Sequence, residues 1–173
     1  MLLKICGCIM IVCGCSAIGF SLGNDYVLRI KHLERMKKNL LLLEGEIKYC
    51  NSGIVEALSK ISRQSGGIFS IFFETIVDDL TQNNKTLKEA WDASVQKNIK
   101  NHTKLTNQDI RIIGELGECL GITDRETQIL NIENTKNQID SIIGELNKIK
   151  TEKCKIYRTL GVVAGMFIAI VLL

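Results

Sequence analysis

The chain has 173 residues, which is enough for one domain and tight for two. It contains no proline, and this excludes proline-rich linkers and favours long unbroken helices, because proline removes a backbone donor and clashes with the preceding turn. Aromatic residues make up only 5%, which is typical of a helical bundle rather than a β-sandwich, and the net charge of +3 is unevenly distributed along the chain.

Two segments carry no charge, residues 5–23 near the start and residues 159–173 at the end. As helices they would span about 28 Å and about 22 Å, against a bilayer core of about 30 Å. We therefore expect a transmembrane helix within residues 1–23 and a transmembrane or membrane-inserted helix at 159–173. A cleaved signal peptide, or a lipoprotein lipidated at Cys15, is an alternative for the first segment, and a buried core helix for the second.

Basic residues flank the inner ends of both segments. They are Arg29, Lys31, Arg35, Lys37 and Lys38 after the first, and Lys148, Lys150, Lys153, Lys155 and Arg158 before the second. The positive-inside rule places residues 24–158 in the cytoplasm, with both basic arms near anionic headgroups. Residues 64–147 carry eight Lys and Arg against thirteen Asp and Glu. This acidic part would either meet a basic partner or form an ordinary solvated surface.

Helical spacing predicts the elements between the two segments. The first helix presents one apolar face: Tyr26, Ile30, Leu33, Met36, Leu40, Leu43 and Ile47. The unbroken run Leu40–Leu43 predicts burial on more than one side of this helix. Ser52 is the expected N-cap of a short second helix that carries Ile54, Leu58 and Ile61. A third helix bears Ile68, Phe69, Phe72, Ile76 and Leu80.

Capping signals mark the remaining helices. Thr86 and Glu89 have capping-box spacing and open a fourth helix. A fifth helix bears Ile110, Ile113, Leu116 and Leu120. A second box, Thr123 to Glu126, opens a long last helix that continues into the C-terminal segment. The predicted fold is all-α: a six-helix cytoplasmic bundle (24–158) flanked by an N-terminal (1–23) and a C-terminal (159–173) membrane helix.

Signals of enzymatic chemistry are weak. His32 and His102 have no partner at metal-ligand spacing and are expected on the surface, and no nucleotide-binding or hydrolase motif is present. We therefore expect no enzyme activity, no cofactor and no metal site. Cys6, Cys8, Cys13 and Cys15 are interpreted as apolar filler of the first segment. Nucleic acid is not an expected partner, because few aromatic residues interleave with the basic ones.

The stretch from Gly114 to Gln128 stands out as a corner between two helices. Gly117 would allow close helix packing, and Gly121 fits the position just after a helix end. Asp124 would add negative charge at the start of the next helix, from whose first turn Arg125 and Gln128 would project. The alternative is a well-made structural corner with no further role.

Three stretches of the sequence carry a resemblance: Leu43–Tyr49, Ala90–Trp91 and Leu116–Gln128. With the two uncharged segments, they resemble the stage III sporulation protein AB family of endospore-forming bacteria over nearly the whole length. The pattern LG-x-x-LG-x-x-DR-x-x-Q is the most specific part. The chain is also similar to the cytoplasmic helical domains of F-type platform proteins in type II secretion and type IV pilus machines. Where the family often has a proline opening the second helix, this chain has Ser52–Gly53.

The resemblance implies a membrane platform subunit of a secretion-like complex between mother cell and forespore, on the mother-cell side of the outer forespore membrane. Its expected partners are the secretion-type ATPase called stage III sporulation protein AA, other membrane subunits of the complex, and the lipid bilayer. The candidate partner-binding residues are Glu118, Asp124, Arg125 and Gln128. The residues of the structural motif are Leu116, Gly117, Leu120, Gly121 and Trp91. The alternative function is a scaffold that packs other membrane subunits through its spans, without ATPase contact.

Overall fold

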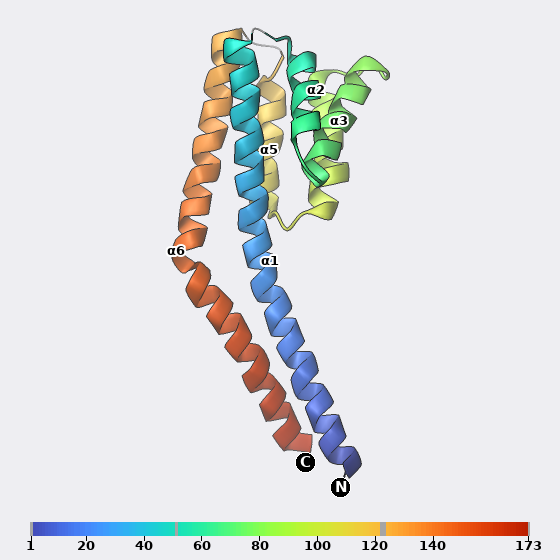
Figure 1. Ribbon diagram of the computed structural model, residues 1–173, viewed down its shortest axis with the longest axis vertical. Helices are drawn as coiled ribbons and strands as arrows, with labels where there is room; N and C mark the ends of the chain where they lie inside the picture. The colour runs from blue at the N-terminus through green and yellow to red at the C-terminus, as the bar shows by residue number, and fades with distance from the viewer. Residues whose placement is uncertain (1, 51, 122–123, 173) are drawn as a thin grey trace. The chain divides into compact units, whose positions relative to one another are not determined.

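The computed structural model describes residues 2–50, 52–121 and 124–172, and within these ranges every regular element is helical. In chain order they are α1 (Leu2–Tyr49), α2 (Ile54–Gln64), α3 (Ile68–Thr81), α4 (Leu87–Ser94), the π-helical segment η1 (Val95–Lys100), α5 (Asn107–Cys119) and α6 (Arg125–Leu172) (Figure 1). The prediction of an all-helical chain is confirmed.

The chain divides into two compact units. Unit 1 combines Met1–Ile30 with Glu145–Leu173, and unit 2 is Lys31–Gly144. The long helices α1 and α6, of 48 residues each, contribute to both units. The uncharged N-terminal segment therefore continues without a break into the first helix of the predicted bundle, as a chain free of proline permits.

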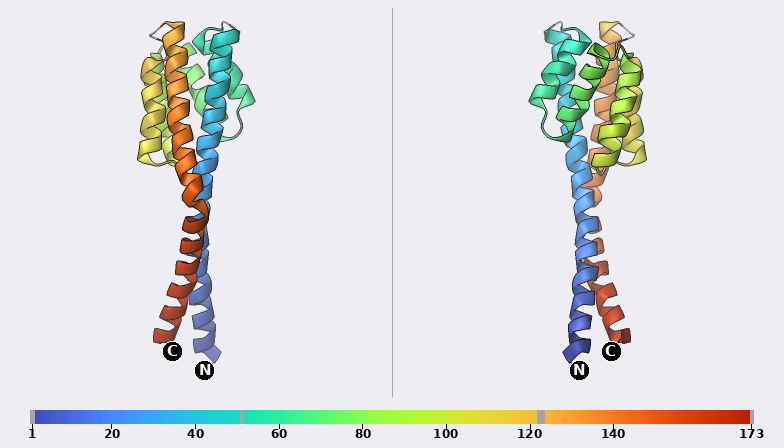
Figure 2. Two further views of the ribbon diagram at one scale, coloured as in Figure 1. Left: turned by 90° about the vertical axis from the view of Figure 1, so that its left-hand side faces the viewer. Right: turned by 90° about the vertical axis from the view of Figure 1, so that its right-hand side faces the viewer.

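The core of unit 2 follows the predicted apolar faces. Leu33, Met36, Leu40 and Leu43 of α1 are fully buried, and Ile47 nearly so. The α2 residues Ala57, Leu58 and Ile61 are buried as well, and α2 packs on α3 (Figures 1 and 2). The aromatic side chains Phe69, Phe72, Phe73 and Trp91 complete the centre, each with no exposed surface. Helical spacing thus identified the core correctly.

The prediction for the run Leu40–Leu43 is wrong at Leu41. This side chain is 58% exposed, while Leu40 and Leu43 are buried. A helix places consecutive residues about 100° apart, so a single apolar stripe leaves one residue of a four-residue run facing out.

The prediction of Ser52 as the N-cap of α2 is also wrong. The helix begins at Ile54, and its N-cap is Gly53, so no side chain caps this helix start. The Ser52 hydroxyl instead donates to the Glu46 carboxylate (3.3 Å), and the Lys60 ammonium donates to both Ser52 and Glu46. The Ser52 hydroxyl therefore binds the ion pair of Glu46 and Lys60 and does not cap α2, although its residue type favours an N-cap.

Three helix starts in unit 2 are capped by side chains. Thr86 and Glu89 form the predicted capping box of α4. Thr106 and Asp109 form a second, unpredicted box at α5, because an Asp carboxylate reaches the same backbone N–H as the usual Glu. The predicted box from Thr123 begins at a residue outside the described ranges. Asp124 serves the start of α6, where its carboxylate accepts from the Thr127 N–H (3.1 Å).

In unit 1 the first part of α1 and the last part of α6 lie side by side (Figures 1 and 2). Glycines allow their backbones to touch: a Cβ added at Gly161 would lie 2.8 Å from the Cys15 carbonyl oxygen and 3.1 Å from the Gly19 Cα. A Cβ added at Gly165 would similarly lie 3.0 Å from the Val12 Cα. Such close contact between small residues is how helices associate in lipid, where burial of apolar surface supplies no driving force.

One helix among the described residues, the Met10–Tyr49 part of α1, is long and apolar enough to cross a membrane, and 11% of its most apolar window is buried. Length and composition alone support this span. The predicted C-terminal span at 159–173 includes Leu173, which is outside the described residues, and side chains at 169, 171 and 172 that are also outside them.

The helix pair of unit 1 predicts a specific crosslink. A Cβ at position 165 would lie 3.1 Å from the Cys15 Cβ, so the two helices need to separate by only about 0.5 Å to reach the Cβ–Cβ distance of a disulfide. We expect Gly165→Cys to form a disulfide with Cys15 on mild oxidation of the full chain, detected by peptide mass mapping. Ala164→Cys, at the adjacent exposed position, is the control and should give little of this product. Equal yields from both variants would contradict the helix pairing.

Candidate functional site

The corner between α5 and α6 is built on glycine and leucine. Leu116 and Leu120 are buried, and α5 ends at Cys119 with Leu120 as its C-cap. Gly121 follows with a φ of +82°, which is a left-handed conformation that disfavours a side chain. A Cβ there would also lie 2.9 Å from the Leu87 Cδ2 at the start of α4. Gly121 thus ends the helix, as its position in the sequence predicts.

The Trp91 side chain of α4 packs closely against α5. A Cβ added at Gly117 would lie 2.4 Å from the Trp91 Cγ, so the indole occupies the space that a side chain at 117 would need. The Trp91 Nε1–H donates to the Ile113 carbonyl one turn earlier (2.9 Å). The indole is also edge-on to Phe72, with centroids 5.1 Å apart. Of the residues of the predicted structural motif, Trp91 and Gly117 are therefore in direct contact, while Gly121 faces Leu87 at the start of α4.

The four candidate partner-binding residues have different local roles. Glu118, in the last turn of α5, is exposed and forms an ion pair with Lys88 (2.8 Å). Asp124 caps α6, and Arg125 donates to the Lys48 carbonyl at the end of α1. Gln128 is half-buried in the next turn, and its N–H donates to the Asp124 carbonyl (3.0 Å). Asp124 and Arg125 thus also stabilise the fold, the first at the start of α6 and the second at the end of α1.

Electrostatics at this corner follow from those contacts. The hydroxyl and N–H of Thr127 donate to Asp124, and these bonds hold the pKa of its carboxyl below the usual range. The Glu118 carboxylate raises the pKa of Lys88 by hydrogen bonding and by charge. The Asp124 carboxylate therefore stays ionised at neutral pH. A carboxylate at the first turn of a helix is also favoured by the helix dipole.

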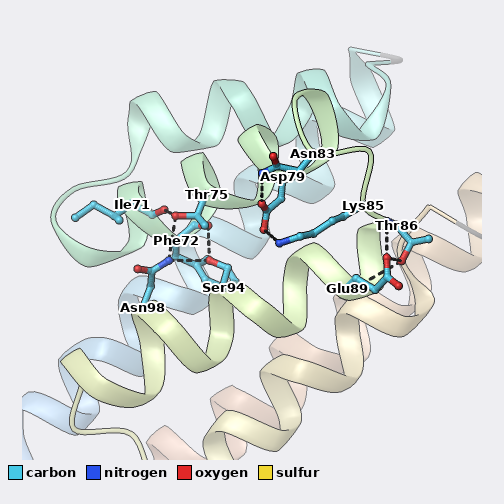
Figure 3. A network of polar contacts seen from close by, with 10 residues as sticks. All are labelled: Ile71, Phe72, Thr75, Asp79, Asn83, Lys85, Thr86, Glu89, Ser94 and Asn98. Atoms are coloured by element: carbon cyan, nitrogen blue, oxygen red, sulfur yellow. Dashed lines mark hydrogen bonds and ion pairs between the residues drawn. The ribbon is translucent and has the colours of Figure 1, made fainter.

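Sequence reasoning missed a buried polar network between α3 and the α4–η1 segment (Figure 3). The Ser94 hydroxyl donates to the Phe72 carbonyl (2.8 Å), and the Asn98 amide donates to Ser94 (3.0 Å) and Thr75 (3.1 Å). The Thr75 hydroxyl donates onward to the Ile71 carbonyl. Each donor of Ser94, Asn98 and Thr75 in this network has an acceptor, so the network has a structural role. The sequence does contain an indication of this network, because the polar residues Ser94 and Asn98 share a helical face with the apolar Trp91 and Val95.

A second polar cluster closes the loop between α3 and α4 (Figure 3). Asp79, almost buried, accepts from the Lys85 ammonium (2.9 Å) and the Asn83 amide (2.7 Å). These contacts hold the pKa of Asp79 below its usual range. The cluster explains how a polar loop positions the Thr86 cap that directly follows it.

His32 is half-buried rather than fully on the surface. Its Nδ1 accepts a hydrogen bond from the Lys104 N–H (3.2 Å), and its ring is edge-on to Phe69. Burial, and then the charge of Arg35, lower the pKa of His32. His102 is exposed, as predicted. Among the described residues no group of three or more His, Cys, Asp or Glu is arranged to hold a metal ion.

These features define an all-helical protein with a Leu-Gly corner packed on a buried tryptophan, and with an N-terminal helix apolar enough to cross a membrane. The family model "Stage III sporulation protein AB (spore_III_AB)" matches residues 4–173, and the chain belongs to this family. The resemblance noted from the sequence is thereby confirmed.

Two known proteins show the same relationship. The chain is 25% identical to "Stage III sporulation protein AB" of Bacillus subtilis (strain 168) over 172 residues, covering 99% of this chain and 100% of the relative. Its fold is similar to a solved structure of "Stage III sporulation protein AB (SpoIIIAB)" with a TM-score of 0.65 and 23% identity. That likeness covers 72% of this chain and 98% of the solved one.

The contact of Trp91 with Gly117 predicts opposite effects of the same substitution at two glycines of α5. Gly117→Ala should destabilise the protein by about 1–3 kcal/mol, because the new Cβ would overlap the indole. Gly114→Ala, with nothing within 4 Å of its Cβ, should stabilise it by up to about 1 kcal/mol through helix propensity. Urea unfolding of the full chain, followed by far-UV circular dichroism, measures both. Equal effects would contradict this packing.

The lowered pKa of His32 predicts a pH dependence of stability. The unfolded chain binds a proton at His32 more readily than the folded chain, so stability should fall as the pH drops through about 6.5. His32→Asn keeps an acceptor for the Lys104 N–H without titrating, and it should flatten the dependence between pH 7.5 and 5.5. His102→Asn is the control. Unfolding midpoints that change with pH to the same extent in all three proteins would exclude His32 as the cause.

Proposed function

We propose that the chain is a non-enzymatic membrane platform subunit of the sporulation complex between mother cell and forespore, and that its helical region docks a secretion-type ATPase. The family match across residues 4–173 carries this proposal. It makes the chain a sporulation stage III AB protein, and the finer role rests on the arguments that follow. Nucleotide hydrolysis would belong to the partner, stage III sporulation protein AA.

The surface of unit 1 supports insertion into a membrane. Large apolar side chains are exposed on both of its helices, among them Ile18 and Leu22 on α1 and Leu160, Val163 and Phe167 on α6. Large apolar side chains exposed in such number mark contact with lipid or with another protein. The glycine contacts bring the two helices together and leave these larger side chains facing outward. We therefore propose that residues 159–173 enter the bilayer beside the N-terminal span.

The orientation follows from charge. Lys and Arg are concentrated after residue 23 and before residue 159, so the positive-inside rule places residues 24–158 on the cytoplasmic side. In a sporulating cell this would be the mother-cell side of the outer forespore membrane. An ATPase that uses cytoplasmic nucleotide could then reach the helical region.

For the docking surface we propose the corner that carries Glu118 and Gln128. Glu118 and Asp124 both present carboxylates at this corner, and the ion pair of Glu118 with Lys88 is exposed and therefore weak. A basic surface of the ATPase could replace Lys88 at little cost. Asp124 and Arg125 would contribute charge while keeping their cap and their bond to the Lys48 carbonyl. Similarity to the F-type platform domains of secretion machines is part of this proposal.

The exposed apolar faces of unit 1 favour one other function, a scaffold that packs other membrane subunits through its spans without touching the ATPase. Replacing both spans with unrelated apolar helices separates the two functions. The scaffold would lose assembly, whereas a docking platform would still bind the ATPase.

We expect Glu118→Gln combined with Asp124→Asn to weaken binding of the full chain to immobilised stage III sporulation protein AA by about tenfold, as lost charge-assisted bonds would. Asn still accepts the Thr127 N–H, so the start of α6 is preserved while the charge is removed. Equilibrium binding of detergent-solubilised protein at two salt concentrations measures the loss.

The matched control is Glu74→Gln combined with Asp78→Asn, which removes the same charge from exposed positions of α3. It should leave binding within about twofold, a difference of less than about 0.5 kcal/mol. Equal weakening by both pairs would show that only net charge matters. Unchanged binding by the first pair would remove the corner from the docking surface.

A further inference from the structure

A groove in unit 1 lies where the uncharged stretches of both helices end. Phe20, Ser21 and Asn24 line it from α1, and Arg158 lines it from α6. The first charged residue of α1 after this stretch is Asp25, and the uncharged stretch of α6 begins directly after Arg158. The groove, of about 470 Å³, therefore has an apolar side toward the chain ends and a polar side toward the charged parts of the helices.

Arg158 is held across this groove. Its guanidinium carbon lies 4.7 Å from the centroid of the Phe20 ring, within the range of a cation–π contact. Stacking occupies the face of the guanidinium and leaves its N–H edge to donate hydrogen bonds, which suits a phosphate. The Ser21 hydroxyl and the Asn24 amide offer neutral donors beside it, and none of the groove's lining residues is a carboxylate.

The surrounding charge also favours an anion. Residues 148–158 hold five Lys and Arg against a single carboxylate, Glu152. Basic residues at the membrane surface attract anionic lipids by about 1 kcal/mol each, and basic pockets between membrane helices select their headgroups. The groove adds shape and a stacked guanidinium to this general attraction.

We propose that this groove binds the headgroup of an anionic phospholipid, with the phosphate on Arg158, Ser21 and Asn24 and the acyl chains along the apolar side. The inference rests on the proposed insertion of unit 1 into the membrane. The apolar wall, formed by Ala17 and the Phe20 ring, favours a lipid over a free phosphate ion, which would need only the polar end.

Native mass spectrometry of the detergent-solubilised full chain tests the proposal. Phosphatidylglycerol should remain bound in preference to phosphatidylcholine, and Arg158→Gln should lower its apparent affinity by about tenfold. Lys153→Gln is the matched control: it removes the same charge from an exposed position about 140° around α6 that does not line the groove. It should change the affinity by less than about twofold. Phe20→Leu should give an intermediate loss, because it keeps the apolar wall and removes the stacking surface.

Each other outcome overturns the assignment. Equal losses from Arg158→Gln and Lys153→Gln would show diffuse attraction without a site. Displacement of the lipid by millimolar inorganic phosphate would show a free-anion site. Flotation of the wild-type chain with phosphatidylcholine and phosphatidylglycerol vesicles separates the two proposals: failure to float removes membrane insertion, whereas flotation with no effect of Arg158→Gln in mass spectrometry removes only the lipid site.

Discussion

The packing of Trp91 into the gap left by Gly117 is the contact on which unit 2 depends. It fixes the separation of α4 and α5, and the indole N–H bond to Ile113 fixes how far one helix slides along the other. The start of α4 then lies beneath Gly121, where Leu87 supports the turn. The first glycine of the leucine–glycine repeat is thus required by the Trp91 ring, and the second by its positive φ and by Leu87.

The buried polar network adds specificity to this packing. Apolar side chains tolerate several arrangements, whereas Ser94 and Asn98 are satisfied only when α3 lies in one register beside η1. Asn98 lies within the π-helical segment η1. Such widened turns are uncommon in helices, and this one carries the amide that binds Thr75 of α3.

The sequence predicted the helices and the core of unit 2 because apolar spacing records burial directly, as at Leu33, Met36 and Leu40. It also predicted the Thr86 cap and the Gly121 stop, which depend on neighbouring residues alone. It failed at Ser52, whose hydroxyl binds Glu46 and Lys60 instead of capping α2. It also failed at Leu41, because one apolar stripe cannot bury all four residues of the run. At the candidate site, no sequence pattern indicates that Arg125 reaches the Lys48 carbonyl, since 77 residues separate the two.

The contacts between α1 and α6 in unit 2 bear on how the chain folds during synthesis. Glu44 pairs with Lys136 and Lys37 with Asp140, across separations of 92 and 103 residues. The helices α2 to α5, by contrast, pack largely on their sequence neighbours. The middle of unit 2 can therefore assemble while the ribosome is still translating, whereas the ion pairs of Lys37 and Glu44 wait for the last helix to emerge. During that interval α1 lacks the helix to which Lys37 and Glu44 bind, and the nascent chain is then more open to proteolysis than the finished fold.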